Sequence, residues 1–231
     1  MIPRPDLTFD RFTLTRGSST AVGLALALAE DTANAPTFLL LHGPPGVGKT
    51  HLLQAIVNLR TARQPRRSLI QIEAAHLVEQ WVAGLTGSTE AALPRGLERA
   101  DLVAIDDLHT LAGKAMTQRE VARAMQGTIA HGGRVVCTLG GSPAELPVLT
   151  TVLRRQPGAR FVTMRPPRAR ELRQVLDVMA RAEQLTLRRD ALAAIADRCA
   201  GDVRRGQGEL ARCRFEQSHL LVRSSTRTQE R

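Results

Sequence analysis

Short apolar runs alternate with helical stretches along the first 165 residues of the chain. Thr37–His42 (TFLLLH) is a continuous apolar run, as expected of a strand that is buried on both faces. Four further strands are predicted after it, at Ser68–Glu73, Leu102–Ile105, Arg134–Thr138 and Phe161–Met164. This alternation predicts an α/β fold with a parallel sheet of five strands.

Apolar residues at helical spacing lie between these runs. Leu52, Ile56 and Leu59 recur at i, i+4 and i+7, which predicts a helix over 49–60. Further helices are predicted over 18–30, 75–85 and 117–131. The last of these is expected to open with a T-x-x-E capping box at Thr117 and Glu120. Residues 84–96 have the least regular pattern and are expected to form a loop.

The pattern changes at Pro166-Pro167. Three helices with apolar stripes are predicted beyond it, over 168–184, 190–200 and 203–221. Gly201 is expected to close the second of them and Asp202 to cap the third. These patterns predict an α/β core over residues 1–165, a helical lid over 166–222 and a polar, disordered tail over 223–231.

The segment between the first strand and its helix, Gly43–Thr50 (GPPGVGKT), satisfies the P-loop pattern G-x-x-x-x-G-K-[ST]. Its glycines allow backbone N–H groups to surround a phosphate, and the following helix presents its positive N-terminus to the same anion. Lys49 is expected to reach the β- and γ-phosphate oxygens, and the Thr50 hydroxyl to ligate Mg²⁺. We therefore predict a site for ATP or ADP with Mg²⁺. Its other contacts would come from Gly43, Pro45, Gly46, Val47 and Gly48.

An acidic half of this site is expected at the end of a neighbouring strand. The run Leu102–Ile105 is followed directly by Asp106-Asp107. Such a pair is by itself often a solvated turn, but beside a P-loop it indicates a functional site. Asp106 is expected to hold Mg²⁺ and Asp107 to polarise the attacking water.

The chain is strongly basic, with 32 Lys and Arg against 22 Asp and Glu and a formal net charge of +10. This balance favours an anionic partner, of which nucleic acid is the usual one. Coding bias offers another explanation, because Lys49 and Lys114 are the only lysines and arginine supplies all other cationic side chains. In such a chain, the lysine kept at position 49 supports the assignment to phosphate.

The three cysteines, Cys137, Cys199 and Cys213, are odd in number and show no CxxC spacing. They are expected to be small buried hydrophobic residues in a reducing compartment. Residues Met1–Phe12 contain no apolar signal-peptide core, and no segment is apolar enough over a sufficient length to span a membrane. A cytoplasmic location without a membrane partner is expected.

In these motifs the sequence resembles the AAA+ module of the DnaA/Hda family of bacterial replication initiators. Four stretches carry the resemblance: Leu7–Phe12 (LTFDRF), Gly43–Leu53 (GPPGVGKTHLL), Ile105–Gln118 (IDDLHTLAGKAMTQ) and Asp202–Arg204 (DVR). It runs from Leu7 to about Leu220 and does not include the family's C-terminal DNA-binding domain. It implies a P-loop NTPase core of the AAA+ type with the sheet order 5-1-4-3-2. A small all-α lid would follow, with the nucleotide between core and lid.

The resemblance also implies roles for individual residues at the nucleotide. Phe9 and Phe12 match aromatic residues of the family that lie near the adenine, and His51 follows the P-loop in the family's manner. Arg204 matches the sensor 2 arginine, which touches the γ-phosphate.

ATP-dependent assembly is a further implication, with an arginine finger of one subunit completing the site of its neighbour. Such an arginine stabilises the charge that develops during transfer of the γ-phosphate. The finger is expected at Arg154 or Arg155, and Arg155 is preferred. The alternative is that both are ordinary surface arginines.

Two departures from the family pattern affect catalysis and DNA contact. The family's sensor 1 reads Thr-Ser-Asp-Arg, whereas this chain has Thr138-Leu139-Gly140-Gly141, so that only Thr138 remains to order the attacking water. Met116 replaces an arginine of the family, which weakens single-strand DNA contact. We therefore expect nucleotide binding to be better preserved than turnover, and any ATPase activity to be slow.

Two functional hypotheses follow. The first is an ATP-binding regulator or accessory factor of DNA replication initiation, which assembles under ATP control with an initiator-type AAA+ protein or with itself. The alternative is a helicase-loader-like nucleotide switch that binds DNA and hydrolyses ATP weakly or not at all. DNA, the sliding clamp and a helicase remain open as partners, although Met1–Asp6 does not match the clamp-binding peptide of Hda-type regulators. A small-molecule kinase is disfavoured, because its acceptor lid would be inserted in the core.

Overall fold

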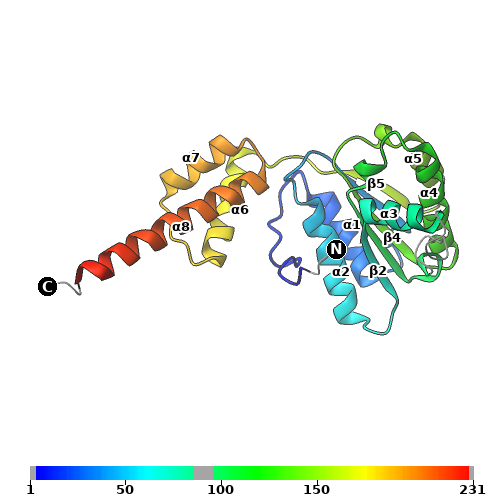
Figure 1. The fold of residues 1–231 in the computed structure, drawn as a ribbon, viewed down its shortest axis with the longest axis horizontal. Helices are drawn as coiled ribbons and strands as arrows, with labels where there is room; N and C mark the ends of the chain where they lie inside the picture. The colour runs from blue at the N-terminus through cyan, green and yellow to red at the C-terminus, as the bar shows by residue number, and fades with distance from the viewer. Residues whose placement is uncertain (1–3, 86–95, 229–231) are drawn as a thin grey trace. The chain divides into compact units, whose positions relative to one another are not determined.

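The computed structural model describes residues 4–85 and 96–228. A five-stranded, all-parallel sheet with the order β2-β3-β4-β1-β5 forms its centre (Figure 1). The strands are β1 (Phe38–His42), β2 (Leu69–Glu73), β3 (Leu102–Asp106), β4 (Arg134–Leu139) and β5 (Ala159–Thr163). The strand order confirms the one that the family resemblance implies, and all five predicted strands are present.

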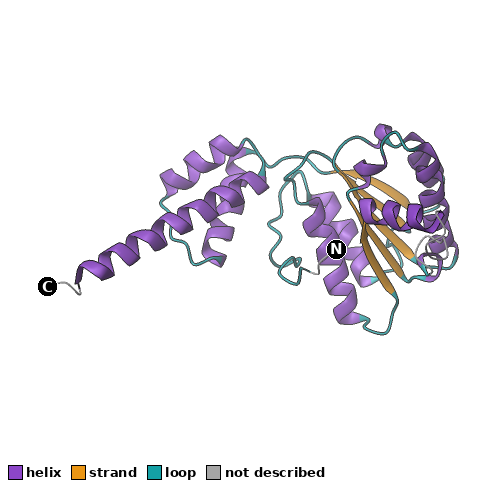
Figure 2. Ribbon diagram, viewed as in Figure 1, coloured by secondary structure: helices purple, strands orange, loops and turns teal. Residues whose placement is uncertain are grey.

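Helices cover both faces of the sheet (Figure 2). On one face lie α1 (Ser19–Glu30) and α2 (Lys49–Arg63); on the other lie α3 (Ala74–Leu85), α4 (Ala115–Ala130) and α5 (Pro147–Arg154) (Figure 1). Side chains alternate between the two faces along a strand, so a strand in the middle of this arrangement buries every residue. In β1 the four residues Phe38–Leu41 are all fully buried. This double burial explains the continuous apolar runs of the sequence.

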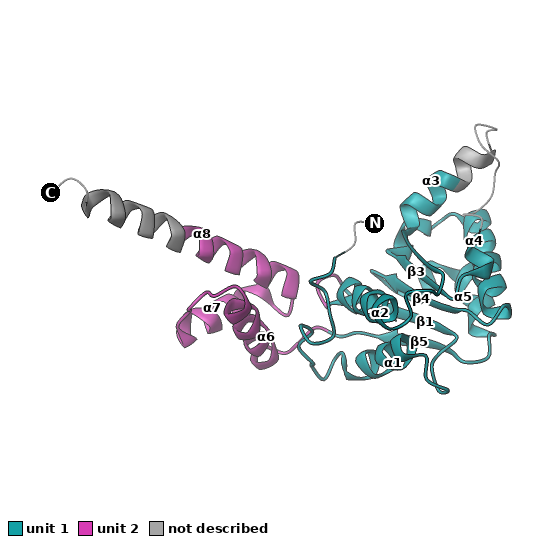
Figure 3. Ribbon diagram, turned by 90° about the horizontal axis from the view of Figure 1, so that it is seen from below, with its two compact units in different colours: residues 1–44, 48–165 teal, residues 45–47, 166–231 magenta. Residues whose placement is uncertain are grey.

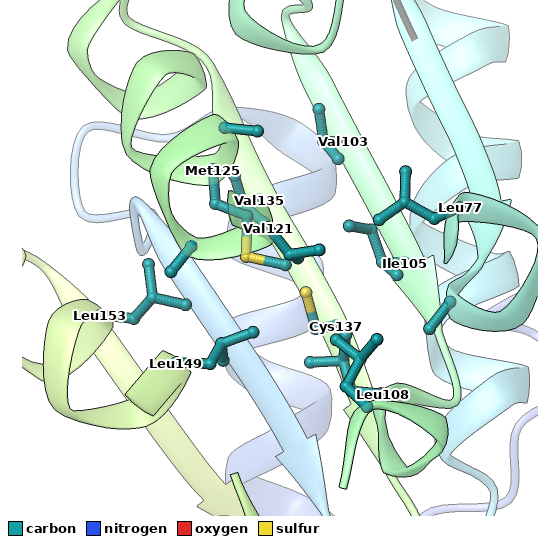
Figure 4. Close-up of a cluster of buried hydrophobic side chains, with 14 of the residues drawn as sticks. Leu77, Val103, Ile105, Leu108, Val121, Met125, Val135, Cys137, Leu149 and Leu153 are labelled. Carbon is teal, nitrogen blue, oxygen red and sulfur yellow. The ribbon is translucent and has the colours of Figure 1, made fainter. Parts of the chain in front are cut away.

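The core beneath α3, α4 and α5 fixes the two strands whose ends carry the acidic pair and Thr138. Strands β3 and β4 contribute Val103, Ile105, Val135 and Cys137, and the helices contribute Leu77, Val121, Met125, Leu149 and Leu153 (Figure 4). Full burial of one such aliphatic side chain stabilises the fold by about 1.5–3 kcal/mol. In the parallel pairing of β3 with β4, Ile105 lies opposite Cys137. The next residues of the two strands, Asp106 and Thr138, therefore lie side by side.

The chain divides into two compact units (Figure 3). Unit 1 comprises residues 1–44 and 48–165, and unit 2 comprises 45–47 and 166–231. Unit 2 holds α6 (Ala169–Ala182), α7 (Arg189–Cys199) and α8 (Val203–Thr228). These helices enclose their own apolar cluster, which includes Leu172, Leu176, Ala180, Leu192, Ile195, Cys199 and Leu210. Within the described ranges, no helix has both the length and the apolar character that a membrane crossing needs.

Asp202 caps α8 as predicted, because the Arg205 N–H donates to Asp202 Oδ1 at 3.1 Å. The helix does not end near residue 221, however, but continues to Thr228. The prediction of a disordered tail from residue 223 is therefore wrong as far as Thr228. Residues 222–228 contain neither glycine nor proline, so the sequence offers no strong interruption to the helix.

Three further predictions concern local structure. The capping box at Thr117 and Glu120 is wrong: α4 begins at Ala115, so Thr117 lies inside its first turn with a buried side chain. The helix α5 was not predicted, nor were the short 3₁₀ helices η1 (Leu97–Arg99), η2 (Leu108–Leu111) and η3 (Pro143–Glu145). The loop predicted over 84–96 falls mostly outside the described residues.

The cysteines are unpaired thiols. Cys137 and Cys199 are buried, as predicted, whereas Cys213 is half-buried. Burial in the sheet raises the pKa of the Cys137 thiol far above its usual value. Cys137 therefore behaves as a small hydrophobic residue, which is the role the sequence predicts.

The glycines of α8 provide a first testable prediction. A Cβ at Gly206 would lie 2.6 Å from Leu176 Cδ2 of α6, whereas a Cβ at Gly208 would have nothing within 4 Å. Glycine in a helix interior is about 1 kcal/mol less favourable than alanine. We therefore expect Gly208→Ala to stabilise unit 2 by about 1 kcal/mol, and Gly206→Ala to destabilise it by about 1–3 kcal/mol through overpacking. Urea unfolding followed by circular dichroism measures both, and equal shifts in the two variants would contradict the close approach of α6 and α8.

Candidate functional site

The P-loop joins the carboxyl end of β1 to the start of α2, as its sequence predicts. Two of its glycines are needed for steric reasons. Gly43 has φ = 142°, and a Cβ there would collide with the Met164 carbonyl at the end of β5. Gly48 has φ = 92°, and a Cβ there would lie 2.7 Å from the Phe12 ring. At these two positions there is room for the backbone but not for a side chain. A loop that holds a phosphate with its backbone N–H groups needs glycine at such positions.

Lys49 is the first residue of α2, and its side chain turns back into the loop. It is 7% exposed, and its Nζ donates to the carbonyl oxygens of Gly43 at 2.8 Å and Pro44 at 2.7 Å. A buried ammonium needs such partners, because loss of water otherwise disfavours its charge. The structure thus brings a cation to the centre of the predicted phosphate site.

The acidic pair lies at the same edge of the sheet. Asp106 ends β3, is 3% exposed, and accepts hydrogen bonds from the hydroxyls of Thr50, at 3.4 Å, and Thr138. Burial raises the pKa of Asp106, and the neighbouring charge of Asp107 adds to this increase. A buried carboxylate whose proton affinity is raised is also suited to a cation, and hydroxyl and carboxylate oxygens are the ligands that Mg²⁺ prefers. Thr50 and Asp106 therefore fit the predicted metal site.

Thr138 connects the two aspartates. Its side chain is fully buried, its hydroxyl donates to Asp106, and it accepts the Asp107 backbone N–H at 2.9 Å. Asp107 itself is a left-handed residue with φ = 59°, and its carboxylate is half exposed. Thr138 thus holds the end of β3 in a shape that buries one carboxylate and exposes the next.

The N-terminal segment is attached to α2 by two polar side chains. His51 Nε2 lies 2.9 Å from the Thr8 carbonyl, and Phe12 packs edge-on against the His51 ring at 5.2 Å between centroids. Burial lowers the pKa of His51, which favours the neutral imidazole. Asn58 Nδ2 donates to the Leu7 carbonyl at 2.9 Å.

The two aromatic residues that the sequence predicts near the nucleotide, Phe9 and Phe12, lie in different surroundings. Phe12 lies directly against the P-loop at Gly48, whereas Phe9 is half-buried in the turn that precedes it. The role of Asn58 was not predicted from the sequence. Its spacing of seven residues from His51, which puts both on one stripe of the helix, is the signal that could have found it.

The two candidate arginine fingers differ in their surroundings. Arg154, in the last turn of α5, lies over the Phe161 ring at 4.2 Å from its centroid. Arg155 is the C-cap residue of α5 and is exposed, and within the described residues it forms no ion pair. Both arginines are exposed, and Arg154 has in addition the contact with the Phe161 ring.

The two glycines of the sensor 1 stretch, Gly140 and Gly141, have different neighbours. Gly141 lies against Glu145, whose carboxylate accepts the Ser142 N–H at 2.7 Å in a capping box that opens η3. A Cβ at Gly141 would collide with that carboxylate. A Cβ at Gly140, by contrast, would meet only the ring of His109, with Nδ1 at 3.7 Å.

The remaining predicted residues belong to unit 2. Pro45, Gly46 and Val47 are part of that unit, in which the Val203 N–H donates to the Gly46 carbonyl at 3.1 Å. Arg204, the predicted sensor 2 residue, is exposed in the first turn of α8. Unit 1 alone therefore brings together Lys49, Thr50, Asp106, Asp107 and Thr138.

Comparison with known proteins identifies the family. The model of the bacterial DnaA ATPase domain matches residues 4–162. The chain is a member of this family. It is 31% identical over 181 residues to the chromosomal replication initiator protein DnaA of Caulobacter vibrioides, an alignment that covers 74% of this chain and 36% of that protein. The chain thus spans about a third of the length of this DnaA relative.

Solved structures of DnaA share the whole fold. Domain III of the Thermotoga maritima replication initiation protein DnaA superposes with a TM-score of 0.82 at 25% identity, covering 99% of this chain and 92% of that one. A replication initiator DnaA bound to AMPPCP and single-stranded DNA superposes with a TM-score of 0.80 at 21% identity, covering 98% and 70%. The DnaA-type AAA+ architecture predicted from the sequence is thereby confirmed.

Proposed function

We propose that this chain binds ATP with Mg²⁺ and uses it to control assembly with AAA+ partners during DNA replication initiation, as a regulator or accessory factor. The observation that carries the proposal is made at one edge of the sheet: the Lys49 ammonium is held inside the P-loop, and the next residue, Thr50, donates to the Asp106 carboxylate that Thr138 also binds. Membership of the bacterial DnaA ATPase domain family supports it, as does the AMPPCP bound to a DnaA of the same fold.

Each residue of the site would have a separate role in binding the nucleotide. The P-loop N–H groups and the positive end of α2 attract the phosphates, and Lys49 would exchange its bonds to the loop carbonyls for bonds to phosphate oxygens. Thr50 and Asp106 would hold Mg²⁺, which neutralises phosphate charge when bound. Asp107, exposed beside them, would orient a water molecule for attack on the γ-phosphate. Arg204, which matches the sensor 2 arginine of the family, would contact that phosphate.

Assembly would place Arg155 of one molecule at the nucleotide of the next. Its exposure at the end of α5 supports this assignment, and the stacking of Arg154 on Phe161 supports the exclusion of the other candidate. An initiator-type AAA+ protein or a second copy of this chain would supply the neighbouring site. Purified protein mixed with the initiator of the same cell and ATP should form a complex that ADP does not support. Absence of any complex with the initiator would contradict the regulatory role.

A complementation experiment tests the finger. We expect Arg155→Ala to bind ATP normally but to lose the turnover that assembly adds, and Lys49→Ala to lose its own site while keeping its finger. Neither variant should hydrolyse ATP alone, whereas an equimolar mixture should recover activity, because intact sites then meet intact fingers. The matched control is Arg154→Ala, which should remain active and lose only the stacking on Phe161, worth about 0.5–1 kcal/mol. A mixture that stays inactive would contradict a finger supplied by the neighbour.

A second candidate is the helicase-loader-like switch that binds DNA with weak or no ATP hydrolysis. The glycines at 140 and 141, which leave sensor 1 without a polar side chain after Thr138, favour it. Nucleotide binding without measurable turnover in any assembly would support this candidate over the first.

A further inference from the structure

The sensor 1 stretch of this chain, Thr138–Gly141, lacks the polar side chain that the family has after the threonine, which would be expected to help position the attacking water. The Thr138 hydroxyl is fully buried, donates its one proton to Asp106 and accepts the Asp107 N–H. A Cβ at Gly141 would displace the exposed Glu145 carboxylate that caps η3. A Cβ at Gly140 would be in ordinary van der Waals contact with one imidazole ring.

That imidazole belongs to His109, which lies in η2 directly after the acidic pair. Its Nδ1 is 3.7 Å from Asp107 Oδ1, and both side chains are half exposed, at 50% and 52%. A separation of this size is too long for a direct hydrogen bond, but a single water about 2.8 Å from each atom can contact both. The ring thus lies between Gly140, where the family has its polar side chain, and the carboxylate expected to orient the attacking water.

We propose that His109 takes the place of the missing sensor 1 side chain and acts as a positioning residue for Asp107 and its water. The inference rests on the proposed ATPase function. Glycine at 140 accompanies this substitution: a Cβ there would already be in van der Waals contact with the imidazole, so a longer side chain would pack against the ring. The alternative is that His109 is an ordinary surface histidine. That alternative does not account for the loss of the family's polar side chain at position 140.

The test is a compensation experiment on ATP turnover. His109→Ala should lower kcat by about 10- to 100-fold, the size of effect that small misplacements of reacting groups produce, while the affinity for ATP and the melting temperature stay unchanged. His109→Gln, which keeps a polar group, should retain part of the activity. Gly140→Asn should also lower kcat in the wild-type background, because its amide competes with the ring for space. The double variant His109→Ala/Gly140→Asn should be more active than either single variant. Without the imidazole, the amide side chain introduced at position 140 has room beside Asp107 and can supply the polar group.

The controls separate failure of this inference from failure of the proposed function. His76→Ala removes an exposed histidine of α3 and should change nothing. If Asp107→Asn abolishes turnover but His109→Ala does not lower kcat, or the double variant shows no recovery, the inference about His109 is wrong while the ATPase function stands. Wild-type protein that binds ATP without ever hydrolysing it would overturn the inference and leave nucleotide binding intact. Protein that binds no ATP would overturn both.

Discussion

Lys49→Ala will lower the affinity of the chain for ATP and ADP by about 10³-fold while leaving the fold in place. Removal of one member of a buried, hydrogen-bonded charge pair costs about 2–5 kcal/mol, which corresponds to a loss of roughly 30- to 4000-fold in affinity. The lost interaction is the one between the ammonium and the phosphates. Isothermal titration calorimetry with ATP and with ADP measures it.

The fold should tolerate this change for a local reason. Lys49 Nζ donates to the carbonyls of Gly43 and Pro44, which belong to the same loop and not to the sheet. Loss of these bonds is expected to lower the free energy of unfolding by about 1 kcal/mol. The circular dichroism spectrum should remain that of the wild type.

The chain offers a matched control for this substitution. Lys114 is the only other lysine, lies exposed before α4, and carries the same charge. Lys114→Ala should therefore leave the nucleotide affinity unchanged. If both variants bound ATP as tightly as the wild type, the assignment of the P-loop would be wrong, whereas an equal loss in both would indicate nonspecific electrostatics.

The fold was predictable because its strands are buried on two faces. Phe38–Leu41 has no exposed residue, so no polar position interrupts the run, and the pattern leaves little alternative to an internal strand. The P-loop and the acidic pair were equally accessible, because each is a contiguous motif at a strand end. Both lie at the same edge of the sheet for a simple reason: the carboxyl ends of parallel strands meet there.

Helix boundaries were less predictable, and two similar motifs show why. Thr117 and Glu120 have the spacing of a capping box and form none, whereas Ser142 and Glu145 have the same spacing and form one at η3. The difference lies in the surroundings. Thr117 is buried inside a helix that starts earlier, while Ser142 is exposed in the segment after β4. Burial depends on the tertiary fold, which local spacing does not contain.

The same limit applies to the site. The attachment of Leu7 to Asn58 and the approach of His109 to Gly140 join residues far apart in the sequence. Helical spacing from His51 marks Asn58, but no local pattern identifies the partner in either contact. The contact of Arg154 with the Phe161 ring likewise depends on the position of β5, which the sequence does not show. Sequence identified the chemical groups of the site, and the packing of the strands determined which of them meet.

A buried ion pair at the other end of α2 leads to the second large effect. Arg60 is 3% exposed; its guanidinium bonds to Asp31 Oδ2 at 3.1 Å and donates to the Leu28 carbonyl at 3.0 Å. Arg134 Nε binds the other oxygen of Asp31 at 3.2 Å. One carboxylate at the C-cap of α1 thus pairs with two cations, one from α2 and one from β4.

Asp31→Asn should therefore destabilise unit 1 by about 3 kcal/mol, at the lower end of the range for a broken buried pair because the Asp31 side chain is 29% exposed. Asparagine keeps the size of the side chain and tolerates the left-handed backbone at φ = 54°, so the substitution removes charge and little else. Urea unfolding at neutral pH measures the loss. The matched control is Glu30→Gln, whose exposed pair with Arg63 is expected to contribute less than about 1 kcal/mol.

The pH dependence of this difference tests its origin. Burial alone would raise the pKa of Asp31, but the hydrogen bonds and charges of Arg134 and Arg60 outweigh it and lower that pKa below its usual value. A carboxylate with a lowered folded-state pKa contributes its full stability above about pH 4 and loses it as the pH falls through the folded-state value. The gap in unfolding free energy between wild type and Asp31→Asn should therefore be constant from pH 5 to 7 and shrink in more acidic solution. A gap that stayed the same throughout the acidic range would mean that asparagine disturbs the packing at the end of α1, and that the charge of Asp31 is not what holds Arg60 in place.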